Sequence, residues 1–245
     1  MWWNGHTLNL LVVAESRVAT VGKAVAAAMP GHYASSARIA DILERLGKQK
    51  AATYLREKLP RSSRIRSGDL AEILATEYVD ARTPFRAPIR RLRWKYHREM
   101  SMRGDDLIAI AVPSEGEPIG FLKAEVKSRA SLNTQAVAAA RESLNGDNGL
   151  PSPHALAFVA DRLAETGNEE LSDLITVAQL NDDISNEQVQ HLLFTLSGNA
   201  PGAFLKTDLE GYGGDIRQNA VGLRVANHRD FVAAVYDAVA AEHEI

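Results

Sequence analysis

Two short extended segments, residues 106–112 and 119–127, constrain the fold most, because helical patterns precede and follow them. The first is a run rich in branched apolar residues. The second alternates, with Leu122, Ala124 and Val126 on one side. A turn-forming sequence, PSEGEP, separates the two segments at residues 113–118. This pattern predicts two adjacent strands joined by a reversal of the chain, within a mixed α/β fold.

Helical and extended patterns alternate along the rest of the chain. The first 60 residues predict a short strand at 8–13 and then helices, with Ser35 and Ser36 as candidate N-caps and Pro60 as the end. The polar, basic stretch 61–67 predicts a linker, so we expect an N-terminal extension at 1–60 and an α/β domain at 61–245. The other expected elements are helices from about Gly68 and at 131–144, 154–165, 168–180 and 228–241, and strands at 91–97, 191–198 and 220–225.

Composition excludes several kinds of site. The chain has no Cys, which rules out a disulfide framework, a thiolate zinc site, an iron–sulfur cluster and a thiol nucleophile. Its 45% hydrophobic and 24% charged residues are typical of a globular protein. The apolar run at 10–14 is too short for a signal sequence or a membrane span. We therefore expect a soluble cytoplasmic protein without a membrane partner.

Charge is unevenly distributed although the whole chain carries only −3. Residues 82–103 include eight Lys or Arg and one Glu, whereas 161–190 include eight acidic residues and one Arg. In the expected strand at 91–97, Arg91, Arg93 and Lys95 share one face, which predicts contact with a nucleic-acid backbone. Two simpler interpretations stay open: both charged runs are solvated faces, or the basic face protects an edge strand from aggregation.

The strongest chemical signal is a pair of carboxylates beside a lysine. Glu125 and Lys127 lie two apart on a strand, so they project from the same face, and the chain reversal brings Asp106 beside them. Two converging carboxylates repel each other unless a cation lies between them, and Mg²⁺ prefers one or two such ligands together with waters and phosphate oxygens. The arrangement predicts a divalent metal site and phosphodiester hydrolysis, with the lysine assisting the nucleophile.

These residues resemble the motifs of the PD-(D/E)xK nuclease superfamily. The matching segments are Glu72 in SGDLAEIL, Asp106 in RGDDLIAI, and Glu125 with Lys127 in FLKAEVKS, within about residues 67–198. The resemblance implies a restriction-endonuclease-like core, a mixed central sheet flanked by helices, with the mainly helical N-terminal extension added. It also implies a DNA endonuclease in which Asp106, Glu125 and Glu72 bind Mg²⁺, or Mn²⁺, and Lys127 assists catalysis.

Within that superfamily, the order of these segments resembles the nuclease subunit of the Hachiman antiphage defence system. That resemblance implies an effector that works with a separate superfamily 2 helicase subunit and cleaves invading or damaged DNA. The chain has no Walker-type phosphate loop, since its glycine-rich segment 198–214 lacks the Gly-Lys-Ser/Thr ending. An ATP-driven function would therefore belong to another chain.

Several alternatives stay open at this stage. The Pro that usually precedes the Asp of this motif is replaced by Gly104-Asp105, so Asp105 competes with Asp106 as a ligand. Asp69 and Glu72 have the spacing of a helix-capping pair. Glu125 and Lys127 could instead form an exposed ion pair worth about 0–1 kcal/mol. The scattered histidines, with no metal-ligand spacing, are interpreted as structural or surface residues: His97, His154, His191 and His228.

Two other functions compete with the defence nuclease. The first is an inactive nuclease fold that binds DNA or serves as an assembly scaffold, since a fold does not guarantee a reaction. The second is a stand-alone restriction endonuclease, which would cut at a defined sequence.

Overall fold

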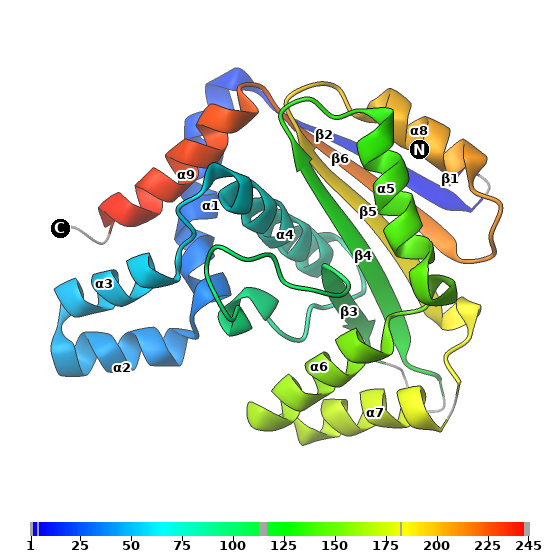
Figure 1. The fold of residues 1–245 in the computed structure, drawn as a ribbon, viewed down its shortest axis with the longest axis horizontal. Coiled ribbons are helices and arrows are strands. Elements are labelled where there is room, and N and C mark those ends of the chain that lie inside the picture. Colours follow the sequence, from blue (N-terminus) through cyan, green and yellow to red (C-terminus); the bar gives the residue numbers. More distant parts are fainter. Residues whose placement is uncertain (1, 4, 113–116, 182, 243–245) are drawn as a thin grey trace.

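The computed structural model describes residues 2–3, 5–112, 117–181 and 183–242, which form one sheet with helices on both faces (Figure 1). The predicted mixed α/β fold is confirmed. The strand order across the sheet is β1-β2-β6-β5-β4-β3. The strands are β1 (Trp2–Trp3), β2 (His6–Val13), β3 (Leu107–Ala111), β4 (Gly120–Arg129), β5 (Val189–Ser197) and β6 (Arg217–Val225).

The central strands of this sheet run parallel. β4 pairs with β5, β5 with β6 and β6 with β2 in parallel, whereas β1 and β3 are antiparallel at the two edges. Strands covered on both faces are buried along their length, and β5, which reads VQHLLFTLS, is buried at every position except Gln190. The pairing of β3 with β4 begins at Leu107 opposite Ala124. Residues 125–129 of β4 therefore extend past β3 and leave an open edge.

The first face of the sheet carries the largest core. Its helices are α1 (Val18–Tyr33), α4 (Ser63–Arg82) and α9 (His228–Glu242). Alternate residues of β4, including Leu122, Ala124 and Val126, point into this core. The predicted alternation of this strand is confirmed, and it directs Lys123, Glu125 and Lys127 to the opposite face.

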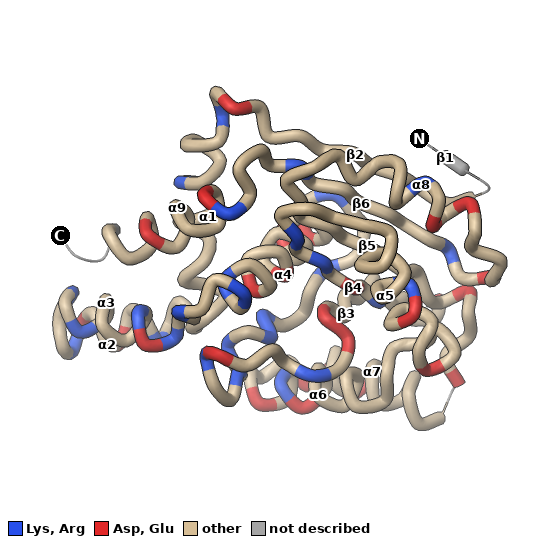
Figure 2. Tube along the Cα trace, turned by 45° about the horizontal axis from the view of Figure 1, so that its top comes forward, with Lys and Arg blue, Asp and Glu red and all other residues tan. Residues whose placement is uncertain are grey.

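The second face is covered in two parts. The helices α5 (Thr134–Asn145) and α8 (Gly202–Gly211) pack on its centre, and α6 (Pro153–Glu165) and α7 (Glu169–Leu180) pack near β3. Figure 2 shows acidic positions along α6 and α7, which carry part of the acidic run. The helix α8 was not predicted, because its glycine-rich sequence does not show a helical period.

The helices before α4 correct two predictions. The helix expected to end at Pro60 is broken into α2 (Ser36–Leu46) and α3 (Lys48–Lys58) at Gly47, whose φ of +82° suits glycine. Ser35 does cap α2, since its side chain accepts from the Arg38 N–H. The expected linker at 61–67 is wrong, because α4 already begins at Ser63.

The strand expected at 91–97 is also wrong. Residues Arg91–Trp94 form a short 3₁₀ helix, closed by hydrogen bonds from the Arg93 N–H to Arg90 O and from the Lys95 N–H to Leu92 O. The alternation of basic and apolar residues there does not correspond to the two faces of a β-strand. Leu92 is buried, and the basic side chains on either side of it contact other groups of the protein.

The N-terminal 60 residues are connected to the rest of the sheet. Their strand β2 pairs with β6, and their helix α1 packs against α9. Whether residue 60 divides two domains stays a prediction. The predicted turn at 113–118 lies largely outside the described residues. Among the helices that are described, none combines the length and apolar character needed to cross a bilayer.

Candidate active site

The open edge of β4 brings together the carboxylates and the lysine that the sequence singled out. Asp106 directly precedes β3 and so lies opposite the point where β4 extends past it. Its Oδ2 accepts a hydrogen bond of 2.9 Å from the Val126 N–H, between Glu125 and Lys127. The carboxylate therefore takes the place of a strand partner and is fixed beside both residues. The predicted proximity of Asp106 to Glu125 and Lys127 is present in the structure.

Glu125 and Lys127 form an ion pair through Oε1 and Nζ. Their side chains are only 12% and 20% exposed, so this is not the solvated surface pair that the sequence left open. A partly buried pair is less screened by water, and each charge depends more strongly on its neighbours.

Glu72 approaches the same edge from α4. Position 72 lies more than two turns inside this helix, so a capping role with Asp69 is wrong. Its Oε2 is buried without a hydrogen-bond partner among the described residues, and its one ion-pair contact is Arg91 Nε at 3.9 Å. A buried carboxylate oxygen without a hydrogen bond is costly, which indicates a site that is completed by another positive group.

Burial and mutual repulsion shift the three carboxylates in the same direction. Burial, with a further contribution from Asp106, raises the pKa of Glu72 to about 8. Burial and the charge of Asp106 raise the pKa of Glu125 to about 7, against the opposing effect of Lys127. Burial also raises the pKa of Asp106, although Arg91 and the Val126 N–H oppose it. Asp106 is thus the common neighbour of both glutamates.

The three carboxylates are neighbours without forming a finished ligand set. Within the described ranges, no group of three or more His, Cys, Asp or Glu side chains has the geometry of a metal site. Arg91 lies against Glu72, and Lys127 lies against Glu125, so protein cations supply part of the counter-charge. The carboxylates still suit a hard divalent cation, because Mg²⁺ requires only one or two of them. The buried Glu72 oxygen offers a further acceptor.

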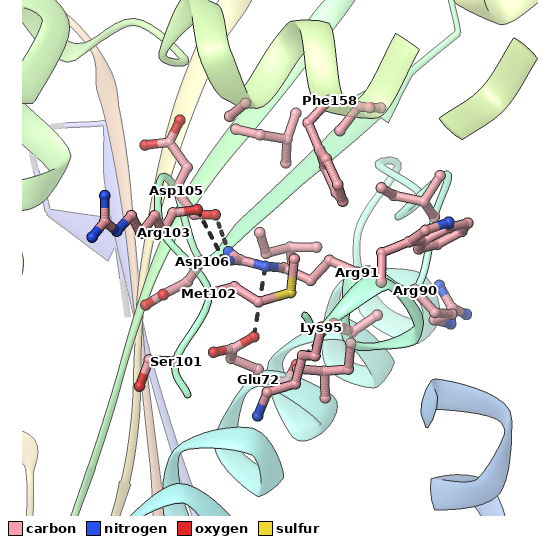
Figure 3. A pocket seen from close by; sticks show the side chains of 18 of the residues that line it. Glu72, Arg90, Arg91, Lys95, Ser101, Met102, Arg103, Asp105, Asp106 and Phe158 are labelled. Carbon is pink, nitrogen blue, oxygen red and sulfur yellow. Dashed lines mark hydrogen bonds and ion pairs between the residues drawn. The ribbon is translucent and has the colours of Figure 1, made fainter. Parts of the chain in front are cut away.

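Asp105 and Asp106 are turned to different sides of the chain (Figure 3). The Asp105 carboxylate accepts from the Ser152 N–H at 2.8 Å and lies 3.6 Å from Lys123 Nζ. These contacts hold it to the loop before α6, away from the Val126 N–H that binds Asp106. The geometry therefore favours Asp106 as the residue that faces the open edge.

The three predicted DNA-contact residues are turned toward the protein. Arg91 pairs with Glu72 and donates to the Asp105 carbonyl, and its side chain is 12% exposed. Arg93 Nε donates to Gly31 O, and Lys95 Nζ donates to both carboxylate oxygens of Asp69 at 2.8 Å. The expected outward cationic face is wrong, because these groups already neutralise or bind interior oxygens.

A hollow of about 350 Å³ opens beside Glu72 and Asp106. Figure 3 shows Arg91 reaching between Glu72 and the Asp105 backbone, with Phe158 across the hollow. Its walls are mostly apolar, and its lining includes neither Glu125 nor Lys127, so the hollow adjoins the Glu72 and Asp106 side of the candidate site. Sequence reasoning missed Arg91 as a member of this site, since its link to Glu72 joins segments that are distant in sequence.

Comparison with known proteins assigns the chain to a family. A family model described as HamA matches residues 3–239, which include all four predicted site residues. The chain belongs to the HamA family. A relative named Hachiman protein HamA, from Bacillus cereus, is 30% identical over 138 residues. That match covers 56% of this chain and 48% of the relative, so the chain spans about half the length of this HamA protein.

Proposed function

We propose that this chain is a metal-dependent DNA endonuclease of the PD-(D/E)xK type. The observation that carries the proposal is the placement of Asp106, Glu125 and Lys127 at the open edge of β4. HamA family membership and the Hachiman relative support a role as the effector of an antiphage defence complex. In that complex, a separate helicase subunit would supply the ATP-driven step.

Asp106 and Glu125 would hold a Mg²⁺ or Mn²⁺ ion, with Glu72 as a third oxygen donor. When bound, the ion would stabilise the negative charge that develops on the phosphoryl oxygens. The carboxylates fit this task because burial, with the charge of Asp106 added, raises the pKa values of Glu72 and Glu125, and a bound cation would favour their charged forms.

Lys127 would position the nucleophile. Its Nζ can donate hydrogen bonds to an attacking water or to an oxygen of the scissile phosphate, while the Glu125 carboxylate keeps the ammonium in place. Arg91 helps to fix the site because it pairs with Glu72 and donates to the Asp105 carbonyl. Its contact with Glu72 therefore positions a proposed ligand.

Cleavage of supercoiled plasmid tests this function. We expect the purified chain, with its helicase subunit, to nick or degrade the plasmid with Mg²⁺ or Mn²⁺ and to leave it intact in EDTA. A nonspecific effector gives nicks or a smear. Discrete bands would instead identify a restriction-type endonuclease, and an intact plasmid under all conditions would contradict nuclease activity and favour the scaffold.

A further inference from the structure

A basic groove lies beyond the proposed active site, where three elements meet. The start of α4, the start of α9 and the end of β4 enclose about 320 Å³. We call it the arginine groove. No Asp or Glu of the described chain lines it, and its ionisable lining residues are Arg61, Arg64, Arg66, Arg129, Arg229 and His228.

Most of these arginines have no anionic partner. Arg61, Arg64, Arg129 and Arg229 are exposed, and the part of the chain that the structure describes offers none of them a carboxylate within ion-pair distance. Arg66 differs, since it lies 3.9 Å from the exposed Asp237 and packs on the Tyr236 ring. Several like charges around one hollow repel each other, so an anion bound there would be stabilised.

Glu99, an acidic residue beside the start of α4, is already engaged. Glu99 accepts hydrogen bonds from the backbone N–H groups of Arg61 and Ser62, at 2.6 and 3.1 Å, and pairs with Arg98. These contacts lower the pKa of Glu99 to about 2. Its charge fixes the chain before α4 and does not neutralise the arginine side chains across the groove.

The N-terminus of α4 adds to the positive potential. Its N-cap residue, Ser62, makes no side-chain capping bond, and the first turn has no acidic residue. The N–H groups of the first turn therefore have no side-chain cap, although the Glu99 carboxylate on the Arg61 and Ser62 N–H groups offsets part of the helix dipole.

His228 provides an independent indication of a ligand. It lines the groove, yet it is only 5% exposed, and its Nδ1 has no hydrogen-bond partner among the described residues. Its Nε2 contacts Ser128 Oγ at 2.8 Å, and Ser128 Oγ accepts from Ser67 Oγ. The Ser128 contact suits either tautomer, and in the tautomer with the proton on Nδ1 the ring presents a buried donor without an acceptor.

We propose that the arginine groove binds phosphodiester groups of the nucleic-acid strand that enters the active site. Lys127 and Arg129 lie two residues apart on β4, which is about 7 Å along the strand. The groove would therefore hold the backbone close to the scissile bond. This placement rests on the proposed nuclease function, whereas anion binding itself does not.

Oligonucleotide binding in EDTA tests the groove without cleavage. We expect Arg64→Ala with Arg129→Ala to weaken binding of a labelled 20-nucleotide DNA about tenfold or more at 100 mM salt, and to lower the salt-dependence slope by about 1.4–1.8. The matched control, Arg38→Ala with Arg45→Ala on the exposed face of α2, removes the same charge and should change binding less than about twofold. Arg64→Lys with Arg129→Lys should keep most of the slope.

The outcomes separate this proposal from the nuclease assignment. If the double variant Arg64→Ala with Arg129→Ala binds DNA with the parental affinity and salt-dependence slope, the assignment of the groove as a binding site is wrong, even if Glu125→Gln abolishes cleavage. Conversely, loss of binding in that variant would support the groove, even if Glu125→Gln still cuts. Thermal stabilisation by inorganic phosphate alone, with DNA binding unchanged by the double substitution, would identify a free-phosphate site and overturn the nucleic-acid assignment.

Discussion

Glu125→Gln is expected to lower Mg²⁺-dependent plasmid cleavage by at least about 100-fold, because replacing even an outer partner of a metal ligand costs about 10–100-fold. Gln keeps the size of the side chain but loses the charge that pairs with Lys127 and would hold the cation. Lys127→Met should cause a comparable loss by a different route, since the carboxylates remain but the nucleophile is no longer oriented.

The matched control for this experiment is Glu142→Gln, which makes the same chemical change at an exposed position of α5. It should cleave like the parent. Circular dichroism should show that all variants fold, because Gln and Met fit the space of the residues they replace. If Glu125→Gln and Lys127→Met cut as fast as Glu142→Gln, the catalytic roles assigned to them are wrong.

Without divalent metal, the free energy of unfolding is expected to fall by about 1–2 kcal/mol from pH 7 to pH 8.5. Glu72, with a pKa of about 8, and Glu125, with a pKa of about 7, keep protons in the folded state that the unfolded chain has already lost. Because the folded state then binds more protons than the unfolded state, raising the pH destabilises it. The melting temperature should drop by about 2–8 °C.

Other groups contribute little to this slope. Burial lowers the pKa of His191 to about 4, so its ring is neutral in the folded state, and the unfolded imidazole, with a pKa of about 6.5, makes only a small opposing contribution above pH 7. Burial raises the pKa of Tyr33 and Tyr236 well above their usual value, which is far above this range. Thermal melts of Glu72→Gln in EDTA should show a smaller drop than the parent. Equal slopes in parent and variant would contradict a buried, protonated Glu72.

The sequence predicted the proximity of Asp106, Glu125 and Lys127 because this geometry is local. Strand alternation places Glu125 and Lys127 on one face, and the reversal between neighbouring strands brings Asp106 opposite them. Because a short connection joins these two strands, few pairings are possible, and the alternation of residues together with the order of the strands predicts the arrangement. The core side of β4 was predicted for the same reason, since Leu122, Ala124 and Val126 have no other face to occupy.

The contacts that the sequence did not predict all join segments that are distant along the chain. Lys95 alternates with apolar neighbours like a strand residue, but Asp69, fixed by a hydrogen bond from Tyr33, binds its ammonium inside the protein. Arg91 likewise turns toward Glu72. The alternation of apolar and basic residues contains no information about such partners. Contacts with distant segments outweigh the strand propensity of residues 91–97.

The arginine groove illustrates the same limit. The stretch at 61–67 predicts a linker because it is polar and basic, and the sequence does not show that Arg129 and Arg229, far along the chain, lie beside it. Only the packing of α4 and α9 at the end of β4 brings these charges together. The acidic run on α6 and α7, by contrast, is local and could be predicted directly.

Calorimetric titration of Mn²⁺ into the metal-free chain at pH 8 tests the central claim most directly. The account predicts one bound ion for the parent, for Lys127→Met and for Asp105→Asn, and loss of that ion in Glu125→Gln and Asp106→Asn. A parent that binds no Mn²⁺, or Glu125→Gln and Asp106→Asn variants that bind it as the parent does, would contradict a shared cation at the open edge of β4.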